Sequence, residues 1–566
     1  MQPIALNEQK RRKKRRVPKR LITSALPYAN GALHFGHIAG AFLPADCYAR
    51  FCRLRGDDVL YIGGSDEYGI PITISAEMAG RTPQEHVDIY HLVNKDLFAK
   101  LNISFDHYSR TSWKGHIPTV QEFFTDLLKN GYIEARTTNQ LYSEKDKRFL
   151  ADRYVTGICP KCGFDGARGD ECPRCAASYE ATDLKNPKSK ISGGSLIPKP
   201  TKHWFLRFDL FAEKLRAWIA TKNLKPSVTH FAMSYVDDLK ARAITRDGEW
   251  GVPIPLADTE GKVLYVWFDA PIGYISATKE GFPDKWKDYW LGKDVHYTQF
   301  IGKDNIPFHA VFFPAMVMGQ NQPYKQVDDI PANEFLNLEG RQFSKSEGWT
   351  IDLDRFFEYF TADQIRYVLA ANAPETQDSE FTWKDFQIRC NSELLGKYGN
   401  LANRLLVFLA NKCGGCIPEA QPDSEFLRKL LDLAHAAAEA YSTYHLRRAT
   451  QIVMEIAAAG NVYFDGEKPW KMQDPVQRAK VLRTCLECLK ILSIVSSPII
   501  PDSAQKLWQM LGKTTTLSKE NWNTALQTPL TPGQLPKPEV LFKRVEDEII
   551  QEEIDKLAIL TKQKLG

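Results

Sequence analysis

Hydrophobic and polar residues at the start of the chain follow the order of a strand, a turn, a helix and a second strand. The apolar run at residues 21–26 predicts a strand, and the turn-forming residues 27–31 come directly after it. Residues 34–55 have the pattern of a helix that ends at Gly56, and residues 59–62 predict the second strand. This βαβ order predicts an α/β fold with a doubly wound parallel sheet, on which ligands bind at the carboxyl ends of the strands.

The rest of the chain divides into an insertion, a return to the sheet and a helical half. From about residue 131 to residue 246, short strands alternate with connections rich in Gly, Ser and Pro, which indicates an inserted domain. The strand-like stretches 263–268 and 295–301 predict further strands of the parallel sheet. After about residue 383, apolar residues recur every three or four positions, which is typical of an antiparallel helix bundle, and residues 545–565 predict its last helix.

These changes of pattern predict six segments in the 566 residues. They are a disordered basic arm (1–20), the first half of a Rossmann-like domain (21–130), a connective insertion (131–246), the second half of the Rossmann-like domain (247–335), a segment with a serine-rich loop (336–385) and an α-helical domain (386–566).

The composition is that of a globular protein with one unusual segment. Hydrophobic residues make up 43% and charged residues 25% of the chain, which excludes a disordered, collagenous or coiled-coil protein. The sequence has no apolar run of about 18 residues, so we expect no membrane span. The net charge of +5 arises from nine Lys or Arg at residues 10–20, and the rest of the chain carries −4. We interpret this arm as a disordered, solvated extension or, alternatively, as a tail that binds a polyanion.

Four of the eleven cysteines have the spacing of a metal site. They form two CxxC pairs with nine residues between them: Cys159, Cys162, Cys172 and Cys175. Four thiolates on two tight turns close a tetrahedron around one zinc ion and leave no position for water, so we expect a structural Zn²⁺. Disulfides are the alternative, but nothing in the sequence indicates secretion. Cys485 and Cys488 lie in an apolar helical pattern as core thiols, and Cys413 and Cys416 lie in a helix-ending loop without an assigned role.

Two short motifs carry candidate chemistry. His34 and His37 open a helix after the first strand and turn, so their N–H donors and the helix N-terminus predict a site for phosphate oxygens. Gly36 between them leaves room for a flat base. Much later in the chain, the loop from Gln342 to Ser346 reads QFSKS, and its Lys345 can neutralise charge that develops on a triphosphate. Each motif alone also fits an ordinary helix or a solvated loop.

Together with three longer stretches, these motifs resemble the class I aminoacyl-tRNA synthetases and, among them, the methionyl-tRNA synthetase family. The stretches are ALPYANG at residues 25–31, YVWFDAPIGY at residues 265–274 and FIGKD at residues 300–304. The resemblance extends from about residue 20 to about residue 560. It implies a methionine–tRNA ligase of the cytoplasm, with a Rossmann-like catalytic domain, a zinc-knuckle connective domain, a loop segment that contacts the tRNA stem and an α-helical anticodon-binding bundle.

The resemblance also implies roles for individual residues. The HIGH-like motif runs from Pro27 to His37, the KMSKS-like motif runs from Gln342 to Ser346, and the implied catalytic residues are His34, His37 and Lys345. The residues implied for methionine are Leu26, Tyr28, Asp66, Trp267, Ala270, Pro271, Tyr274 and His309, of which Asp66 pairs with the ammonium group. The residues implied for ATP are His34, Gly36, His37, Gly302, Asp304 and Lys345. A polarizable thioether suits aromatic edges, and a cationic amine suits a fixed carboxylate.

The implied reaction has two steps and uses no covalent enzyme intermediate. The methionine carboxylate attacks the α-phosphate of ATP, which arrives with Mg²⁺, and the products are methionyl-adenylate and pyrophosphate. The terminal ribose hydroxyl of tRNA(Met), initiator or elongator, then takes the methionyl group, and positioning and charge stabilisation carry the rate. In the helical domain, Asn400 and Arg404 on one helix face, together with Trp470, are implied to read the anticodon. For these three the alternative is a capped helix with a core tryptophan.

The sequence departs from the family pattern at one position, and two rival functions are open to it. Gln342 stands where the family motif begins with lysine, so we expect weaker ATP binding with activity retained. A synthetase for leucine, isoleucine or valine would need an editing domain, whereas zinc-knuckle sequence occupies much of the insertion of about 115 residues. A non-catalytic paralogue predicts damage at His34, His37, Asp66 or Lys345, and all four are intact. Many family members continue into a dimerising OB-fold domain, and this chain ends about where that domain begins, so we expect a monomer.

Overall fold

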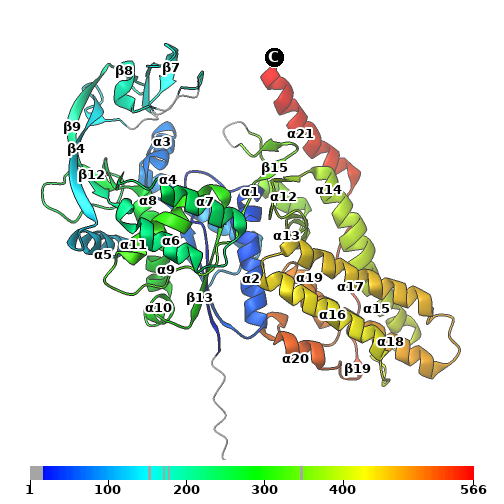
Figure 1. Ribbon diagram of the computed structural model, residues 1–566. Helices are drawn as coiled ribbons and strands as arrows, with labels where there is room; N and C mark the ends of the chain where they lie inside the picture. The colour runs from blue at the N-terminus through cyan, green and yellow to red at the C-terminus, as the bar shows by residue number, and fades with distance from the viewer. Residues whose placement is uncertain (1–16, 151–153, 170–171, 176–178, 345–347, 566) are drawn as a thin grey trace, which may run out of the picture.

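The structure, a computed structural model, describes residues 17–150, 154–169, 172–175, 179–344 and 348–565. Its first half is built on five parallel strands in the order β14-β13-β1-β2-β3 (Figure 1). Their bounds are β1 Lys19–Ser24, β2 Asp58–Ser65, β3 His107–Arg110, β13 Val295–Gly302 and β14 Ala332–Asn333. Because the chain order reverses between β1 and β13, a ligand site is expected where these strands end. The predicted doubly wound parallel sheet is confirmed.

One predicted strand of this sheet is wrong. Lys262–Leu264 form β12, which pairs antiparallel with β11 (Thr245–Asp247) outside the parallel sheet. The residues that follow, Val266–Asp269, form the short helix α8 instead of continuing a strand. A short apolar run fits a buried helix as well as a buried strand, so the pattern alone could not separate the two. As a result, Trp267 and Asp269 project from a helix at the end of the sheet.

The helix predicted for residues 34–55 is present but has three parts. After the N-cap residue His34 come α1 Phe35–His37, the π-helix η1 Ile38–Phe42 and α2 Leu43–Leu54. The chain turns at Gly56, whose φ of 84° lies in the left-handed region that glycine favours. The other helices of this half are α3 Ile70–Met78, α4 Pro83–Lys100, α5 His116–Lys129, α9 Gly273–Gly281, α10 Trp286–Trp290, the π-helix η7 Phe308–Phe312 and α11 Phe313–Met318.

A long antiparallel pair of strands carries the insertion away from the sheet. β4 Ile133–Ser143 and β9 Leu196–Leu206 pair along their whole lengths, and a small sheet in the order β7-β6-β8 lies beyond them (Figure 1). The short strands are β5 Arg148–Phe149, β6 Val155–Ile158, β7 Asp165–Arg168, β8 Lys185–Ser189 and β10 Arg242–Ala243. Two helices that the pattern did not predict, α6 Ala212–Ala220 and α7 Pro226–Asp237, pack into the hydrophobic core of the parallel sheet.

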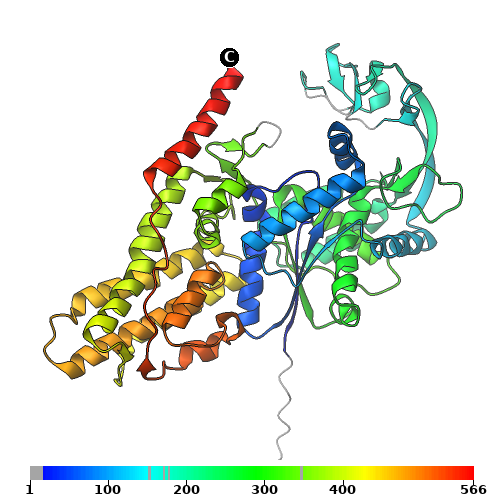
Figure 2. The same ribbon diagram turned by 180° about the vertical axis from the view of Figure 1, so that it is seen from behind.

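From Trp383 on, the second half is mainly helical, as predicted (Figure 2). It also has one short antiparallel pair of strands, β18 Cys416–Ile417 and β19 Gly533–Gln534. Before it lie β15 Leu336–Leu338, β16 Arg341–Gln342, α12 Leu353–Tyr359, α13 Ala362–Ala371 and β17 Ser379–Phe381. The bundle comprises α14 Trp383–Ile388, the π-helix η8 Arg389–Gly399, α15 Asn400–Lys412, α16 Ser424–Ser442, α17 Leu446–Glu467, α18 Pro475–Ser496, α19 Pro501–Met510, α20 Trp522–Gln527 and α21 Asp547–Leu565. Cys485 and Cys488 are fully buried core thiols, as expected. Across the described residues, no helix is both long and apolar enough to span a bilayer.

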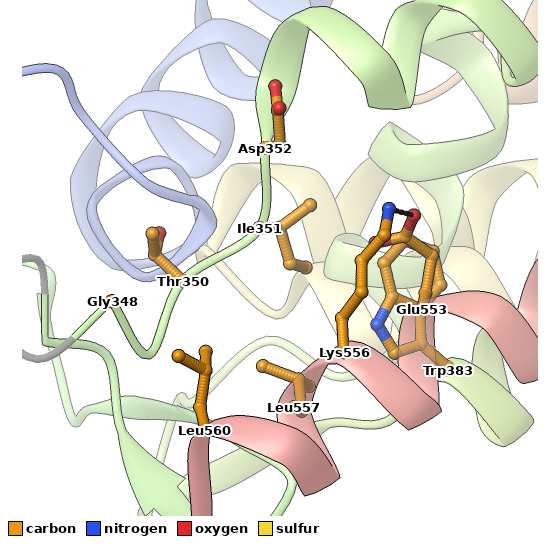
Figure 3. Close-up of a pocket in the computed structure, with 9 residues that line it drawn as sticks. All are labelled: Gly348, Thr350, Ile351, Asp352, Trp383, Glu553, Lys556, Leu557 and Leu560. Atoms are coloured by element: carbon orange, nitrogen blue, oxygen red, sulfur yellow. Dashed lines mark hydrogen bonds and ion pairs between the residues drawn. The ribbon is translucent and has the colours of Figure 1, made fainter. Parts of the chain in front are cut away.

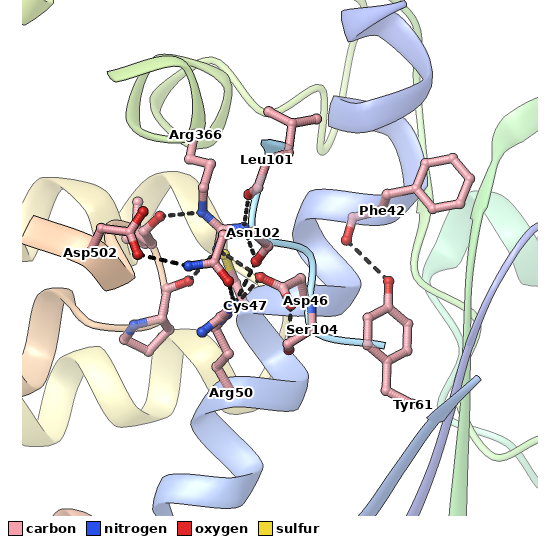
Figure 4. A network of polar contacts seen from close by, with 12 residues as sticks. Phe42, Asp46, Cys47, Arg50, Tyr61, Leu101, Asn102, Ser104, Arg366 and Asp502 are labelled. Atoms are coloured by element: carbon pink, nitrogen blue, oxygen red, sulfur yellow. Dashed lines mark hydrogen bonds and ion pairs between the residues drawn. The ribbon is translucent and has the colours of Figure 1, made fainter. Parts of the chain in front are cut away.

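A buried polar network joins the two halves beside α2 (Figure 4). Arg366 of α13 is fully buried and pairs with Asp46 of α2 at 2.7 Å. The Arg366 guanidinium also donates to four backbone carbonyls, those of Pro498 and Ile499 in the bundle and those of Leu101 and Asn102 beside the sheet. The ion pairs with Arg366 and Arg50 and hydrogen bonds from Ser104 outweigh the effect of burial and hold the pKa of Asp46 far below its usual value. The helix that begins at His34 is therefore tied through α2 to the helical half.

Candidate active site

The predicted site residues of the first half gather at the carboxyl ends of the central strands. His34 and His37 follow β1, Asp66 follows β2, and Asp304 follows β13. Three short backbone hydrogen bonds hold the ends of these strands together: Ala25 N–H to Phe300 O, Asp66 N–H to Pro27 O and Ala29 N–H to Asp66 O, at 2.8–2.9 Å. Tyr28 and Asp66 form an isolated parallel bridge there. These hydrogen-bonded strand ends bring together residues from distant parts of the sequence.

The two histidines cap the helix that they open. His34 Nδ1 accepts the N–H of Gly36 at 3.1 Å, and His37 Nδ1 accepts the N–H of His34 at 3.2 Å. A neutral imidazole whose Nδ1 accepts must carry its proton on Nε2. The two rings lie side by side, with centroids 3.8 Å apart. The helix therefore presents two Nε2–H donors from neighbouring rings, which suits an anionic ligand.

Phe343, from the loop some 300 residues later, lies against this helix. Its ring stacks on the imidazole of His34, with centroids 4.6 Å apart and an interplanar angle of 5°. A Cβ at Gly36 would lie only 3.2 Å from Phe343 Cδ2, so the glycine makes room for the phenyl ring. Ser344 N–H donates to Trp349 O at 2.9 Å. The loop and the HIGH-like helix thus meet directly, although Lys345 and Ser346 lie outside the described residues.

Asp66 is a buried carboxylate without a basic partner. It is 2% exposed, and within the described residues no lysine or arginine forms an ion pair with it. Its contact is the N–H of Tyr68 at 3.5 Å. Burial raises the pKa of Asp66 well above its usual value, and the neighbouring carboxyl of Asp269 raises it further. Such a group is stabilised by a cation, so the site is suited to bind one.

Aromatic side chains form a wall beside Asp66. The rings of Trp267 and Phe308 stack with centroids 3.5 Å apart, and Tyr28 meets the edge of Trp267 at 6.2 Å. A cavity of about 240 Å³ adjoins this wall. It lies between Trp267 and Phe308 and the residues of β10 and β11, from Arg242 to Arg246. It is lined by Phe208, Arg242, Ala243, Ile244, Arg246, Tyr265, Trp267, Phe268, Phe308, Phe312 and Met316. The wall offers flat, polarizable faces to an apolar side chain.

Tyr274, which lies near Asp66, forms a buried hydrogen-bonded pair with His309. His309 Nδ1 lies 3.0 Å from the carbonyl of Asn305 and therefore carries the proton, so Nε2 accepts the Tyr274 hydroxyl at 2.8 Å. Burial lowers the pKa of His309 to about 4, which keeps the ring neutral at pH 7. The pair presents a polar but uncharged surface.

The remaining predicted residues line the same region. Ala270 and Pro271 are buried in the short helix η5 Ala270–Ile272, directly after α8. Leu26 packs so closely on Gly273 that a Cβ there would lie 2.8 Å from Leu26 Cδ1. At the end of β13, a Cβ on Gly302 would lie 2.7 Å from Asp304 Oδ1, so the glycine lets this carboxylate fold back on the strand.

Sequence reasoning missed three contributors to this site. Asp269 stands within the quoted stretch at residues 265–274 but received no role, and it is fully buried next to Asp66. His116 of α5 is also fully buried and lies 3.4 Å from Asp269. Phe343 stands within the KMSKS-like motif but received no role of its own. Asp269 could have been found as a charged residue inside an apolar stretch, whereas nothing local marks His116 or Phe343.

The four cysteines of the insertion come together as predicted. Their sulfur atoms all lie within 4.8 Å of one another, with Cys159 at 3.8 Å from Cys175 and Cys162 at 3.6 Å from Cys172. Burial opposes ionisation of Cys159, but the N–H groups of Cys162 and Lys161 lower its pKa to about 6. Thiolates are the form that binds metals, and the cluster has the size and donor set for one metal ion.

The residues predicted for the anticodon lie on neighbouring elements of the bundle. Asn400 and Arg404 of α15 share a face, because Asn400 bonds Asn461 and Arg404 pairs with Asp465 one turn further along α17. The Arg404 guanidinium lies 5.9 Å from the ring of Trp470, which is 43% exposed. The arrangement leaves a tryptophan face and a cationic group together at the surface.

The C-terminal helix covers the segment that follows the KMSKS-like loop (Figure 3). A cavity of about 420 Å³ lies between them, with Leu557 and Leu560 of α21 on one side and Gly348, Thr350, Ile351 and Asp352 on the other. Arg355 Nε donates to Glu553 Oε1 at 2.8 Å at its margin. The lining residues do not include those gathered at the end of the sheet, so this cavity is separate from the candidate active site.

Comparisons with known proteins agree with this geometry. A family model described as "tRNA synthetases class I (M)" matches residues 20–406, and one described as "Anticodon binding domain of methionyl tRNA ligase" matches residues 417–560. The methionine–tRNA ligase of Protochlamydia amoebophila is 61% identical over 562 residues, 96% of this chain and 80% of that protein. That of Chlamydia abortus is 54% identical over 511 residues, 88% of this chain and 92% of that protein. A solved structure, Mycobacterium tuberculosis methionyl-tRNA synthetase in complex with methionyl-adenylate, is similar with a TM-score of 0.77 and 27% identity, covering 93% of this chain and 100% of that chain.

Proposed function

This chain belongs to the methionyl-tRNA synthetase family of the class I aminoacyl-tRNA synthetases, and we propose that the residues at the ends of β1, β2 and β13 form its methionyl-adenylate site. The enzyme activates methionine with ATP and transfers the methionyl group to the 3′-terminal ribose of tRNA(Met). We propose that it serves both initiator and elongator tRNA and works in the cytoplasm, where translation takes place.

Methionine is assigned to the space between Asp66 and the aromatic wall. Its ammonium group pairs with Asp66, which is buried without a basic partner in the described structure. Its thioether lies against aromatic edges, which suit a polarizable sulfur. The residues proposed for this pocket are Leu26, Tyr28, Asp66, Trp267, Ala270, Pro271, Tyr274 and His309. The neutral Tyr274–His309 pair admits an apolar side chain and offers no charge to a competing ion.

ATP is assigned to the HIGH-like helix and the end of β13. The Nε2–H groups of His34 and His37 would donate to phosphate oxygens, and Lys345 would stabilise the departing pyrophosphate. Asp304, which folds back over Gly302, would hold the ribose, and the backbone at Gly36 would lie next to the nucleotide beside the ring of Phe343. Mg²⁺ bound to ATP would neutralise part of the phosphate charge. Because the carboxylate and the α-phosphate react directly, the work of these residues is positioning and charge stabilisation.

The other segments would serve the tRNA. We propose that residues 131–246 form a connective domain in which Cys159, Cys162, Cys172 and Cys175 hold one structural Zn²⁺. Residues 336–385 would contact the tRNA stem, and residues 386–566 would bind the anticodon. There the face of Trp470 would stack on an unpaired base, and Asn400 and Arg404 would bond base edges.

The observation that carries the assignment is the buried carboxylate of Asp66, with which no lysine or arginine of the described residues forms an ion pair, and Asp66→Asn tests it. Loss of a hydrogen bond to a charged group costs about 1.5–3 kcal/mol, so the KM for methionine in ATP–pyrophosphate exchange should rise roughly tenfold to a hundredfold. The KM for ATP should hardly change. The matched control is Asp288→Asn, which removes an exposed carboxylate paired with Lys19. An unaltered methionine KM in Asp66→Asn would remove Asp66 from the site.

A further inference from the structure

A second carboxyl group lies behind Asp66, and the proposed function does not use it. Asp269 ends α8, directly before Ala270 and Pro271 of the methionine pocket, and is fully buried. In its ionised form Asp269 would raise the pKa of Asp66 and also that of Tyr68, so it faces the same buried space as both. Its Oδ1 has no hydrogen-bond partner among the described residues. Two ionised carboxylates in one buried space would repel each other and lack water to stabilise them.

Asp269 is linked to the wall of the pocket by a short chain of hydrogen bonds. Its Oδ2 lies 3.4 Å from His116 Nε2, His116 Nδ1 lies 2.8 Å from the hydroxyl of Ser276, and that hydroxyl donates to the carbonyl of Gly273 at 3.2 Å. Gly273 is the residue on which Leu26 packs, and a Cβ on it would lie 4.0 Å from His116 Cε1. This series of hydrogen bonds therefore lies next to the part of the pocket wall formed by Leu26 and Gly273.

The Ser276 hydroxyl has one proton to give and lies within reach of both Gly273 O and His116 Nδ1. In the arrangement in which it gives that proton to Gly273 O, its oxygen accepts from His116, which then carries its proton on Nδ1. Burial lowers the pKa of His116 to about 3, so the ring is neutral and Nε2 has a lone pair and no proton. The hydrogen bond between Nε2 and Asp269 then requires the proton to come from Asp269. Burial raises the pKa of Asp269 well above its usual value, in agreement with a neutral acid.

We propose that Asp269 is a positioning residue that acts as a neutral, proton-donating acid on His116, so that Asp66 is the one ionised carboxyl that meets the substrate ammonium. This inference rests on the assignment of Asp66 to the ammonium group. It gives the site a charge of −1 to match the +1 of the ammonium. A second negative charge would instead repel the methionine carboxylate, which must approach the α-phosphate.

Variants at the two aspartates separate a need for charge from a need for a donor. Asparagine at position 269 can still donate to His116 Nε2 through its amide, whereas alanine cannot. We therefore expect Asp269→Ala to raise the methionine KM in ATP–pyrophosphate exchange. Asp269→Asn should raise it much less. At Asp66 the charge is needed, so Asp66→Asn should raise the methionine KM at least about tenfold. Its methionine KM should be no lower than that of Asp66→Ala.

Infrared spectroscopy with ¹³C-labelled aspartate reads the protonation state directly. The C=O band of a protonated aspartic acid should be present in methionine-saturated wild type and in Asp66→Asn, and it should weaken in Asp269→Asn. If Asp269→Asn raises the methionine KM as much as Asp66→Asn does, Asp269 is ionised and the proposal is overturned. Absence of the band in methionine-saturated wild type overturns it too and needs no variant that might misfold. If Asp66→Asn leaves the methionine KM unchanged, the assignment of Asp66 to the ammonium group fails, and the inference fails with it.

Discussion

Replacement of Arg366 by methionine should weaken the junction between the catalytic and helical halves. Methionine keeps much of the aliphatic volume but removes the guanidinium that serves four backbone carbonyls and Asp46. One-sided loss of a buried ion pair costs about 3–5 kcal/mol. Asp46 keeps its contacts with Arg50 and Ser104, so the lower figure of about 3 kcal/mol applies. At about 2–4 °C per kcal/mol, the unfolding midpoint should fall by about 6–12 °C.

Differential scanning calorimetry measures this shift, with the midpoint as the quantity compared because a chain of several domains can unfold in steps. The control is Arg216→Met, which breaks an exposed ion pair with Asp237 and should cost less than about 1 kcal/mol. Adding Asp46→Asn to Arg366→Met should cost less than the sum of the two single changes, because the residues are in contact. Aminoacylation should fall more than ATP–pyrophosphate exchange, since only the former needs both halves. A midpoint for Arg366→Met equal to that of Arg216→Met would refute this reasoning.

Three further predictions concern the metal, the basic arm and the assembly state. Cys162→Ser should release the zinc and lower aminoacylation through misplacement of the tRNA acceptor end, and full activity in a variant shown by metal analysis to be zinc-free would contradict this. Deletion of residues 1–16 removes seven of the nine cations of the arm but spares Lys19 and Arg20, which pair with Asp288 and Asp57 in the fold. It should weaken tRNA binding and make the salt dependence shallower by about 0.7–0.9 for each phosphate that the arm neutralises, with exchange unaffected, and an unchanged salt slope would make the arm a passive extension. Sedimentation at micromolar concentration should give a monomer, and a dimer would refute that expectation.

The sequence predicted the elements whose signals are local. The first strand, the helix that follows and the long helices of the bundle all have strong patterns, and each is present. The strand predicted at residues 21–26 is observed two residues earlier, as β1 Lys19–Ser24, so Lys19 and Arg20 belong to the sheet and not to the predicted disordered arm. Residues 263–268 were misassigned because a six-residue apolar run has no period that separates a strand from a helix. The π-helices at Ile38–Phe42 and Phe308–Phe312 were not predicted either, since they change the backbone pairing without changing the apolar pattern.

Within the site, the sequence could name the residues of recognisable motifs but not the contacts between distant segments. The four cysteines were predicted as a cluster because their spacing alone determines the geometry. In contrast, Phe343 stacks on His34 only because the fold brings the KMSKS-like loop against the start of the HIGH-like helix. Asp269 and His116 meet for the same reason, across 153 residues of sequence. Such pairs leave no periodic or spacing signal in a single chain.

ATP–pyrophosphate exchange with each of the twenty amino acids is the measurement that tests the central claim most directly. The assay requires a site that binds ATP and the amino acid together and joins them, and it needs no tRNA. We predict exchange that depends on methionine and is absent with leucine, isoleucine and valine. Exchange with one of those three but not with methionine, or no exchange with any amino acid, would contradict the account.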